Sequence, residues 1–174
     1  ATVAKARDYT VGTYNTEWMV AFQSGRGAPE SVAMKTLAPL NESSDAGIKY
    51  FSGTARYTKS ITLKSAPAKG ERLFLDLGQI GDVAQVWVNG KLVGTAWFAP
   101  YRVDVTGHMV KGKNAVEIRV ANKWVNRLIG DGQEGAQKVA YAAIPTYAPN
   151  APLRAAGLIG PVTPIDSTTP LSSI

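Results

Sequence analysis

The chain has 174 residues, of which 45% are hydrophobic and 18% charged, and this balance predicts one globular domain and excludes a disordered chain. It contains no cysteine, which excludes disulfides, thiolate metal sites and a cysteine nucleophile. The formal net charge is +6, but the basic residues are spread along the sequence, so we expect solvated surface and no nucleic-acid partner. The alternative is an anionic ligand, either an acidic polysaccharide or nucleic acid.

The sequence shows no membrane or export signal. No apolar run approaches the roughly 20 residues that a membrane-spanning helix needs, so we expect no membrane partner. The first residues lack the basic and then apolar pattern of a secretory signal peptide. Because the sequence begins at Ala1 without a methionine, we expect a processed product or an excised domain.

The N-terminal part leads into the first predicted strands. Residues 1–16 show no clear period and are interpreted as an arm that leads into the domain. Apolar side chains then alternate at Trp18, Val20 and Phe22, which predicts a first strand, and residues 32–40 follow as a second.

The middle of the chain alternates between apolar and polar residues. Lys59 falls on the apolar face of its strand, which indicates either a bulge or a side chain that extends to solvent. The alternating apolar sets are Ala55, Tyr57, Ile61 and Leu63; Leu73, Leu75 and Leu77; Ala84, Val86 and Val88; Tyr101, Val103 and Val105; and Val116, Ile118 and Val120.

Turn signals separate these strands. Asn89-Gly90 predicts a two-residue type I′ hairpin, because both central residues of that turn need positive φ. Residues 136–143 have some helical character, but the Gly, Pro and Tyr residues around them argue against a helix. A short strand is expected after Gly160, before a Pro/Ser/Thr-rich end.

Together these patterns predict an all-β fold, an antiparallel two-sheet β-sandwich. We expect the sandwich to cover residues 17–163, with residues 1–16 as an arm and residues 164–174 as a flexible tail. Strands of five to eight residues without crossover helices are typical of this class.

Several segments resemble the jelly-roll domains of glycoside hydrolases, which belong to the galactose-binding-domain-like superfamily. These segments are residues 57–63, 73–77, 86–90, 93–94, 103–106 and 112–114. More narrowly, residues 49–55, 122–131 and 157–161 resemble the C-terminal region of glycoside hydrolase family 106, the α-L-rhamnosidases and their relatives. Two positions depart from that pattern: Val125 stands where a proline is expected, and Gly132 stands where an acidic residue is expected.

The resemblance implies a non-catalytic module of a large polysaccharide-degrading enzyme. The catalytic barrel of such enzymes needs roughly 250 residues and does not fit in this chain. A catalytic glycoside hydrolase domain of a parent protein is therefore an expected partner. The resemblance also implies a bacterial protein that is secreted or periplasmic, and we expect it to be a monomer.

The acidic residues are interpreted as structural. Glycoside hydrolysis usually needs two carboxyl groups about 5–10 Å apart. Asp76, Asp82 and Asp104 adjoin turns or loops and are expected to stabilise them, and Asp131 is expected to pair with Arg127. We therefore expect no enzyme activity and no cofactor.

A structural Ca²⁺ is the one metal considered. Domains of this superfamily often hold one, and Ca²⁺ prefers carboxylate and carbonyl oxygens. An oxygen-rich loop at Asn41, Glu42 and Asp45 is the candidate, although an ordinary polar loop is the expectation.

Aromatic and polar residues at strand ends are the candidate sugar contacts. Sugars stack on flat rings, and their hydroxyls bind planar polar groups. Pro100 is expected to push its neighbours out of the sheet as a loop or edge. The predicted ligand-binding residues are Trp97, Tyr101, Arg102, Trp124, Asn126, Arg127 and Asp131.

Other aromatic residues are assigned differently. Trp18, Phe22, Tyr57 and Phe74 follow strand alternation and are expected in the core. Trp87 is ambiguous, because its face carries both apolar and polar residues. The alternative for Trp97 and Trp124 is packing in the core or against another domain.

The predicted function is carbohydrate binding without catalysis, on plant or algal polysaccharide that contains rhamnose or uronic acid. The alternative is a structural β-sandwich of an α-L-rhamnosidase that packs on the catalytic domain and binds no sugar itself. A small enzyme that acts on polysaccharide is disfavoured, since the sequence shows no convergent acid, base and nucleophile.

Overall fold

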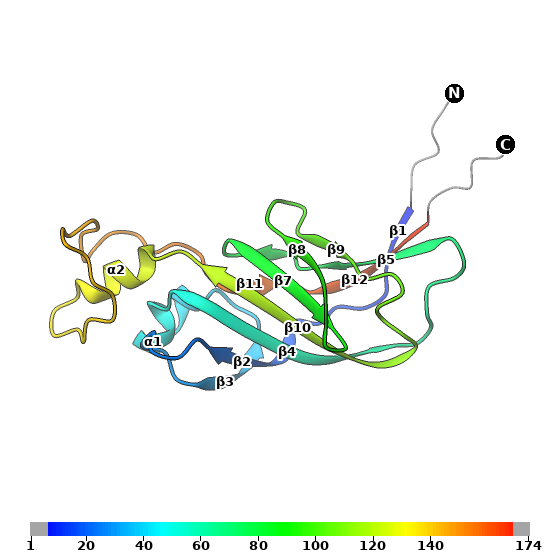
Figure 1. Ribbon diagram of the computed structural model, residues 1–174, viewed down its shortest axis with the longest axis horizontal. Helices are drawn as coiled ribbons and strands as arrows, with labels where there is room; N and C mark the ends of the chain where they lie inside the picture. Colours follow the sequence, from blue (N-terminus) through cyan, green and yellow to red (C-terminus); the bar gives the residue numbers. More distant parts are fainter. Residues whose placement is uncertain (1–6, 169–174) are drawn as a thin grey trace, which may run out of the picture.

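The computed structural model describes residues 7–168, which form an all-β fold with two main antiparallel sheets (Figure 1). The six-stranded sheet has the order β3 (Ser31–Thr36), β2 (Thr16–Phe22), β4 (Gly53–Leu63), β10 (Gly112–Asn122), β7 (Val83–Val88) and β8 (Lys91–Ala96). The four-stranded sheet has the order β1 (Arg7–Thr10), β12 (Thr163–Thr168), β5 (Glu71–Asp76) and β9 (Arg102–Asp104). The expected β-sandwich is confirmed.

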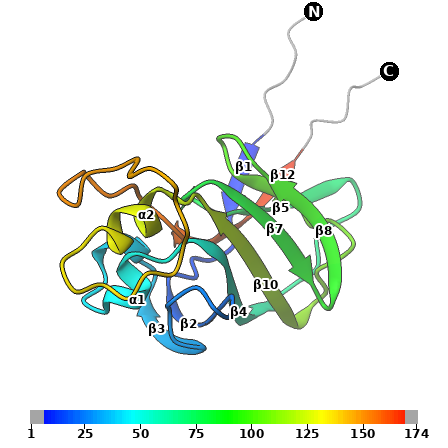
Figure 2. The same ribbon diagram turned by 60° about the vertical axis from the view of Figure 1, so that its left-hand side comes forward.

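Shorter elements complete the fold. Strands β6 (Gln79–Ile80) and β11 (Leu158–Gly160) form a two-stranded sheet. A 3-10 turn, η1 (Leu40–Glu42), precedes the short helix α1 (Ala46–Lys49), and α2 (Val125–Asp131) follows β10. Both helices lie at one end of the sandwich (Figures 1 and 2). None of the described helices is long and apolar enough to cross a bilayer.

The core lies between the facing sides of the two sheets. Trp18, Tyr57 and Ile118 are among its largest fully buried side chains, and the alternating sets from the other strands join them. Phe74 is an exception: it is half-buried, with the Arg72 guanidinium 5.1 Å from its ring. Its parity, opposite to that of Leu73 and Leu75, accounts for this position.

Lys59 shows how one charged residue fits the apolar face of β4. The pairing of β4 with β10 runs without a register shift, so no bulge is present there. The Lys59 ammonium extends to the main chain of β2 and donates hydrogen bonds to the carbonyls of Thr16 (2.8 Å) and Glu17 (3.3 Å). The extended side chain is therefore the correct alternative.

The Asn89-Gly90 hairpin is confirmed. Both residues have positive φ, 49° for Asn89 and 81° for Gly90, and they join β7 to β8. The Asn89 carboxamide also accepts a hydrogen bond from the Ala115 amide and donates one to Asn114, which ties the start of the turn to β10.

Both ends of the described chain belong to the sandwich, which differs from the expected boundaries. β1 lies within the expected arm and pairs with β12, and β12 occupies residues expected as flexible tail. β12 lies between β1 and β5, so its backbone is hydrogen-bonded on both sides. The short strand expected after Gly160 is therefore present, but the Pro and Ser/Thr residues gave no sign that it continues to Thr168. Residues 1–6 and 169–174, the rest of the expected arm and tail, lie outside the described residues.

The segment after Trp124 forms a helix that the sequence analysis did not predict. Residues 125–131 form helix α2, whereas residues 136–143 contain no helix, as their Gly, Pro and Tyr neighbours indicated. A long irregular segment, residues 132–157, follows α2 and leads back to β11. We call it the long loop.

Candidate carbohydrate-binding site

The strand register brings the candidate residues to one end of the sandwich. Ala84 on β7 pairs with both Val120 on β10 and Ala96 on β8. The C-terminal ends of β8 and β10 therefore point the same way. Trp97 follows β8, and Trp124 follows β10 just before α2, so both residues come directly after strands that end on the same side of the six-stranded sheet.

Trp97 is the most open of the predicted contacts. Its side chain is 67% exposed and packs edge-to-face on Phe98, which is 62% exposed, with the ring centroids 5.1 Å apart. Residues 97–101 lie outside the strands, as expected from Pro100. The pair therefore presents apolar ring surface to solvent.

Tyr101 and Arg102 are held by the four-stranded sheet. Tyr101 is half-buried against the core. The Arg102 guanidinium donates through Nε to Asp76 Oδ2 at 2.7 Å, and the two residues are paired across β9 and β5. These contacts anchor the strand that follows the Trp97–Phe98 loop.

Trp124 is partly covered. Its side chain is 42% exposed, and the Arg26 guanidinium lies 4.5 Å from the ring centroid. Arginine stacked on indole stabilises both side chains. A sugar has less free ring surface here than at Trp97.

The polar groups of Asn126, Arg127 and Asp131 are turned inward. Only 3%, 5% and 7% of these residues is exposed, respectively. Asn126 exchanges two hydrogen bonds with the Arg154 backbone, at 2.7 and 2.8 Å. The Asp131 carboxylate accepts from the amides of Val139 (3.0 Å) and Ala140 (2.7 Å).

The Arg127–Asp131 contact is an ion pair inside this network. Arg127 Nε lies 2.9 Å from Asp131 Oδ1, although its N–H is not aimed well enough for a directed hydrogen bond. The sequence favoured such a structural contact. Asn126 and Asp131 thus fix the long loop through their side chains, and whether these residues and Arg127 also contact a sugar stays a prediction.

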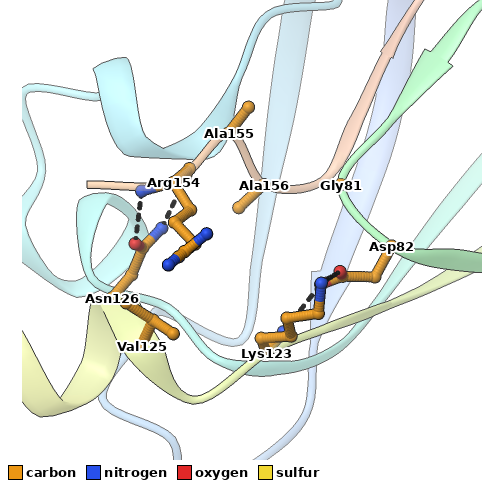
Figure 3. A pocket seen from close by; sticks show the side chains of 8 residues that line it. All are labelled: Gly81, Asp82, Lys123, Val125, Asn126, Arg154, Ala155 and Ala156. Carbon is orange, nitrogen blue, oxygen red and sulfur yellow. Dashed lines mark hydrogen bonds and ion pairs between the residues drawn. The ribbon is translucent and has the colours of Figure 1, made fainter. Parts of the chain in front are cut away.

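A hollow of about 370 Å³ at the same end was missed from the sequence (Figure 3). Asp82 and Lys123 form an ion pair of 2.5 Å on one side, and Arg154 and Asn126 lie on the other. Asp82 also accepts from the Lys123 amide at 3.0 Å. The lining comes from three separate segments, which no local pattern connects.

Two of the carboxylates expected to be structural, Asp76 and Asp104, have structural partners. Asp76 accepts from the Gly78 amide at 2.8 Å, and Asp104 accepts from the Thr106 amide at 2.9 Å, as turn and loop residues should. Burial acts to raise the pKa of Asp104, but hydrogen bonds from Thr106 and the Arg72 guanidinium outweigh it and lower the pKa below its ordinary value.

The oxygen-rich loop has a structural partner as well. Asp45 Oδ1 caps α1 by accepting from the Ile48 amide at 3.1 Å. Within residues 7–168 no three His, Cys, Asp or Glu side chains gather to hold a metal ion.

Comparison with known proteins identifies the family of this domain. Residues 34–156 match the family described as the glycosyl hydrolase 2 galactose-binding domain-like family. The chain belongs to this family. The galactose-binding-like domain is 54% identical to a solved rhamnosidase from Novosphingobium sp. PP1Y, with a TM-score of 0.92 over 95% of this chain and 16% of that one.

Two further relatives are glucuronidases by name. A protein of Formosa agariphila, whose name assigns it provisionally to the β-glucuronidases, is 44% identical over 115 residues, which is 66% of this chain and 10% of that protein. An FMN-binding β-glucuronidase of Faecalibacterium prausnitzii L2-6 shares the fold, with a TM-score of 0.61, 19% identity and coverage of 93% and 23%. The galactose-binding-like domain thus spans about a tenth to a quarter of these relatives.

Proposed function

We propose that this galactose-binding-like domain is a non-catalytic carbohydrate-binding module of a glycoside hydrolase. The observation that supports it best is the exposed Trp97–Phe98 pair after β8, together with a polar hollow at Asp82, which precedes the neighbouring strand β7. A sugar ring would stack on the indole, while its hydroxyls would meet Asp82, Lys123 and Arg154.

The parent enzyme that we propose is an α-L-rhamnosidase of glycoside hydrolase family 106. The resemblance of residues 122–131 and 157–161 to that family supports this assignment, as does the 54% identity to a rhamnosidase. The substrate class would then be plant or algal polysaccharide with rhamnose or uronic acid, met by a secreted or periplasmic bacterial protein. We also propose that the domain is monomeric on its own.

A structural role is the second candidate, supported by the long loop. Tyr141 and Ile144 are 93% and 76% exposed, while buried polar groups of α2 hold the loop in one shape. A fixed loop with exposed apolar side chains suits contact with a catalytic domain.

Affinity electrophoresis in rhamnose-containing and pectic polysaccharides tests the proposal. The domain should be retarded, and Trp97→Ala should lose about 1–3 kcal/mol of binding free energy, as for an exposed aromatic anchor. Tyr141→Ala, which removes another exposed ring, is the matched control and should bind normally. Loss with Tyr141→Ala but not with Trp97→Ala would move the sugar site to the long loop, and an absence of retardation would favour the structural role.

A further inference from the structure

The outer face of the six-stranded sheet is a second surface with the character of a binding site. Helices α1 and α2 lie at one end and do not cover the middle of this sheet (Figures 1 and 2). On β4, β10 and β7 the face has a hollow of about 560 Å³, lined by Thr58, Ser60, Trp87, Glu117 and Arg119 among others. Trp97 does not line this hollow: it follows the C-terminal end of β8, whereas Trp87 pairs with Leu92 near the start of that strand.

The register places two arginines opposite each other on this face. Arg56 on β4 pairs directly with Arg119 on β10, and like charges at such positions destabilise a sheet. Glu117 is their shared partner, with its carboxylate 2.6 Å from Arg119 Nε and 3.8 Å from Arg56 Nη1. Two guanidinium groups and one carboxylate leave this part of the face positive.

Arg119 is oriented by the Trp87 ring. Its guanidinium carbon lies 4.4 Å from the ring centroid, and stacking uses the face of the guanidinium while its N–H groups still point outward in its plane. Nε donates to Glu117, whereas the two terminal nitrogens have no hydrogen-bond partner within residues 7–168. They are free to bind a planar anion such as a carboxylate.

Trp87 supplies a second unsatisfied donor. Its side chain is half-buried, and its Nε1 is buried without a hydrogen-bond partner within the described part of the chain. A buried donor without an acceptor is unfavourable. The Thr58 and Ser60 hydroxyls line the same hollow and offer further contacts to a ligand.

We propose that this face, defined by Arg56, Trp87, Glu117 and Arg119, is a second carbohydrate site that binds uronic-acid residues of an acidic glycan. The guanidinium of Arg119 binds the sugar carboxylate, Arg56 adds positive charge, and Glu117 orients both arginines. The inference shares with the proposed function only the class of ligand, because its residues lie on a different surface.

Titration calorimetry with oligogalacturonate and with a neutral galacto-oligosaccharide tests this site. Arg119→Gln should weaken oligogalacturonate binding about tenfold, the effect of losing a charge-assisted hydrogen bond, and should leave neutral binding unchanged. Lys113→Gln, an equal change of charge at an exposed position on the same strand, is the matched control and should have almost no effect. Arg56→Gln, which removes the second guanidinium of the face, should also weaken oligogalacturonate binding and serves as the test if Arg119→Gln does not fold.

Three results would overturn the inference. An equal loss of affinity for oligogalacturonate with Arg119→Gln and with Lys113→Gln would show that net charge alone attracts the ligand. Binding of a DNA oligonucleotide as tight as that of oligogalacturonate would show a general polyanion surface. Loss of all glycan binding with Trp97→Ala, and none with Arg119→Gln and Arg56→Gln, would leave the proposed function intact and remove the second site.

Discussion

At the scale of single residues, the two candidate tryptophans have different surroundings. Trp97 contacts Phe98 and solvent, whereas Trp124 packs under Arg26 at the start of α2. We expect Trp97→Ala to leave the melting temperature almost unchanged, and Trp124→Ala to lower the free energy of unfolding by about 1 kcal/mol through the lost cation–π contact. Thermal denaturation of both variants checks this prediction, and an equal decrease in the stability of the two variants would contradict it.

Asp131 is the residue whose removal should be most damaging near the site. Asp131→Ala leaves the Arg127 charge buried and two loop amides without an acceptor. Breaking a buried pair from one side costs about 3–5 kcal/mol. Chemical denaturation should show this loss, and the control Glu134→Ala, an exposed residue beyond α2, should be neutral. An unchanged free energy of unfolding for Asp131→Ala would mean that the network does not hold the long loop.

A pH effect is expected from Asp166 on β12. Burial, with the Glu71 charge adding to it, raises the pKa of the Asp166 carboxyl above its ordinary value. A raised folded-state pKa means that the favourable contribution is present below the unfolded pKa and is lost as pH rises through the folded pKa. Asp166→Asn should therefore raise the melting temperature slightly at neutral pH and not at acidic pH. A decrease at neutral pH would contradict the assignment.

At the scale of elements, the return of the chain into β11 depends on one close approach. Gly157 has φ of 85°, and a Cβ there would lie 2.4 Å from the Tyr57 hydroxyl and 2.6 Å from Leu40 Cγ. Gly135 also has positive φ, 70°, but open space around it. Gly135→Ala should lower the free energy of unfolding by about 1–2 kcal/mol through backbone strain alone, and Gly157→Ala should lower it distinctly more. Chemical denaturation measures both values. Similar decreases for the two variants would show that Tyr57 and Leu40 move easily to make room for the added Cβ.

The strands with a clear alternation were predictable from the sequence, and the exceptions have physical causes. β4, β7 and β10 each bury one face, so apolar and polar residues alternate along their sequences with a period of two. The short strand expected after Gly160 is β12, but its Pro and polar residues do not mark where it ends, and pairing with β1 and β5 continues it to Thr168. α2 has just seven residues, too few for a helical period to stand out.

The same limits apply to the candidate site. Trp97 was accessible to prediction because Pro100 and the end of β8 mark a loop. The inward turn of Asn126 and Asp131 was not, because it depends on where α2 begins. Trp87 remained ambiguous, since only the cross-strand neighbours Glu117 and Arg119 reveal its setting.

At the scale of the whole molecule, the net charge of +6 should make binding of acidic glycans depend on salt. Exposed charges are screened within about 8 Å at physiological ionic strength, so retention on a uronic-acid polymer should fall as salt rises. Retention on a neutral polymer should change little. Affinity chromatography at several salt concentrations measures this, and retention of the acidic polymer that is indifferent to salt would point to ring stacking alone.

The central claim is that this domain binds carbohydrate through exposed rings, and the four tryptophans allow a direct measurement. Their indole N–H signals can be followed separately by ¹⁵N NMR during titration with rhamnose- and galacturonate-containing oligosaccharides, after assignment by substitution. We predict that the Trp97 signal shifts with saturation, that the Trp87 signal shifts only with acidic oligosaccharides, and that the signal of buried Trp18 stays in place. Unchanged indole signals at millimolar oligosaccharide would contradict the claim and leave the structural role as the better account.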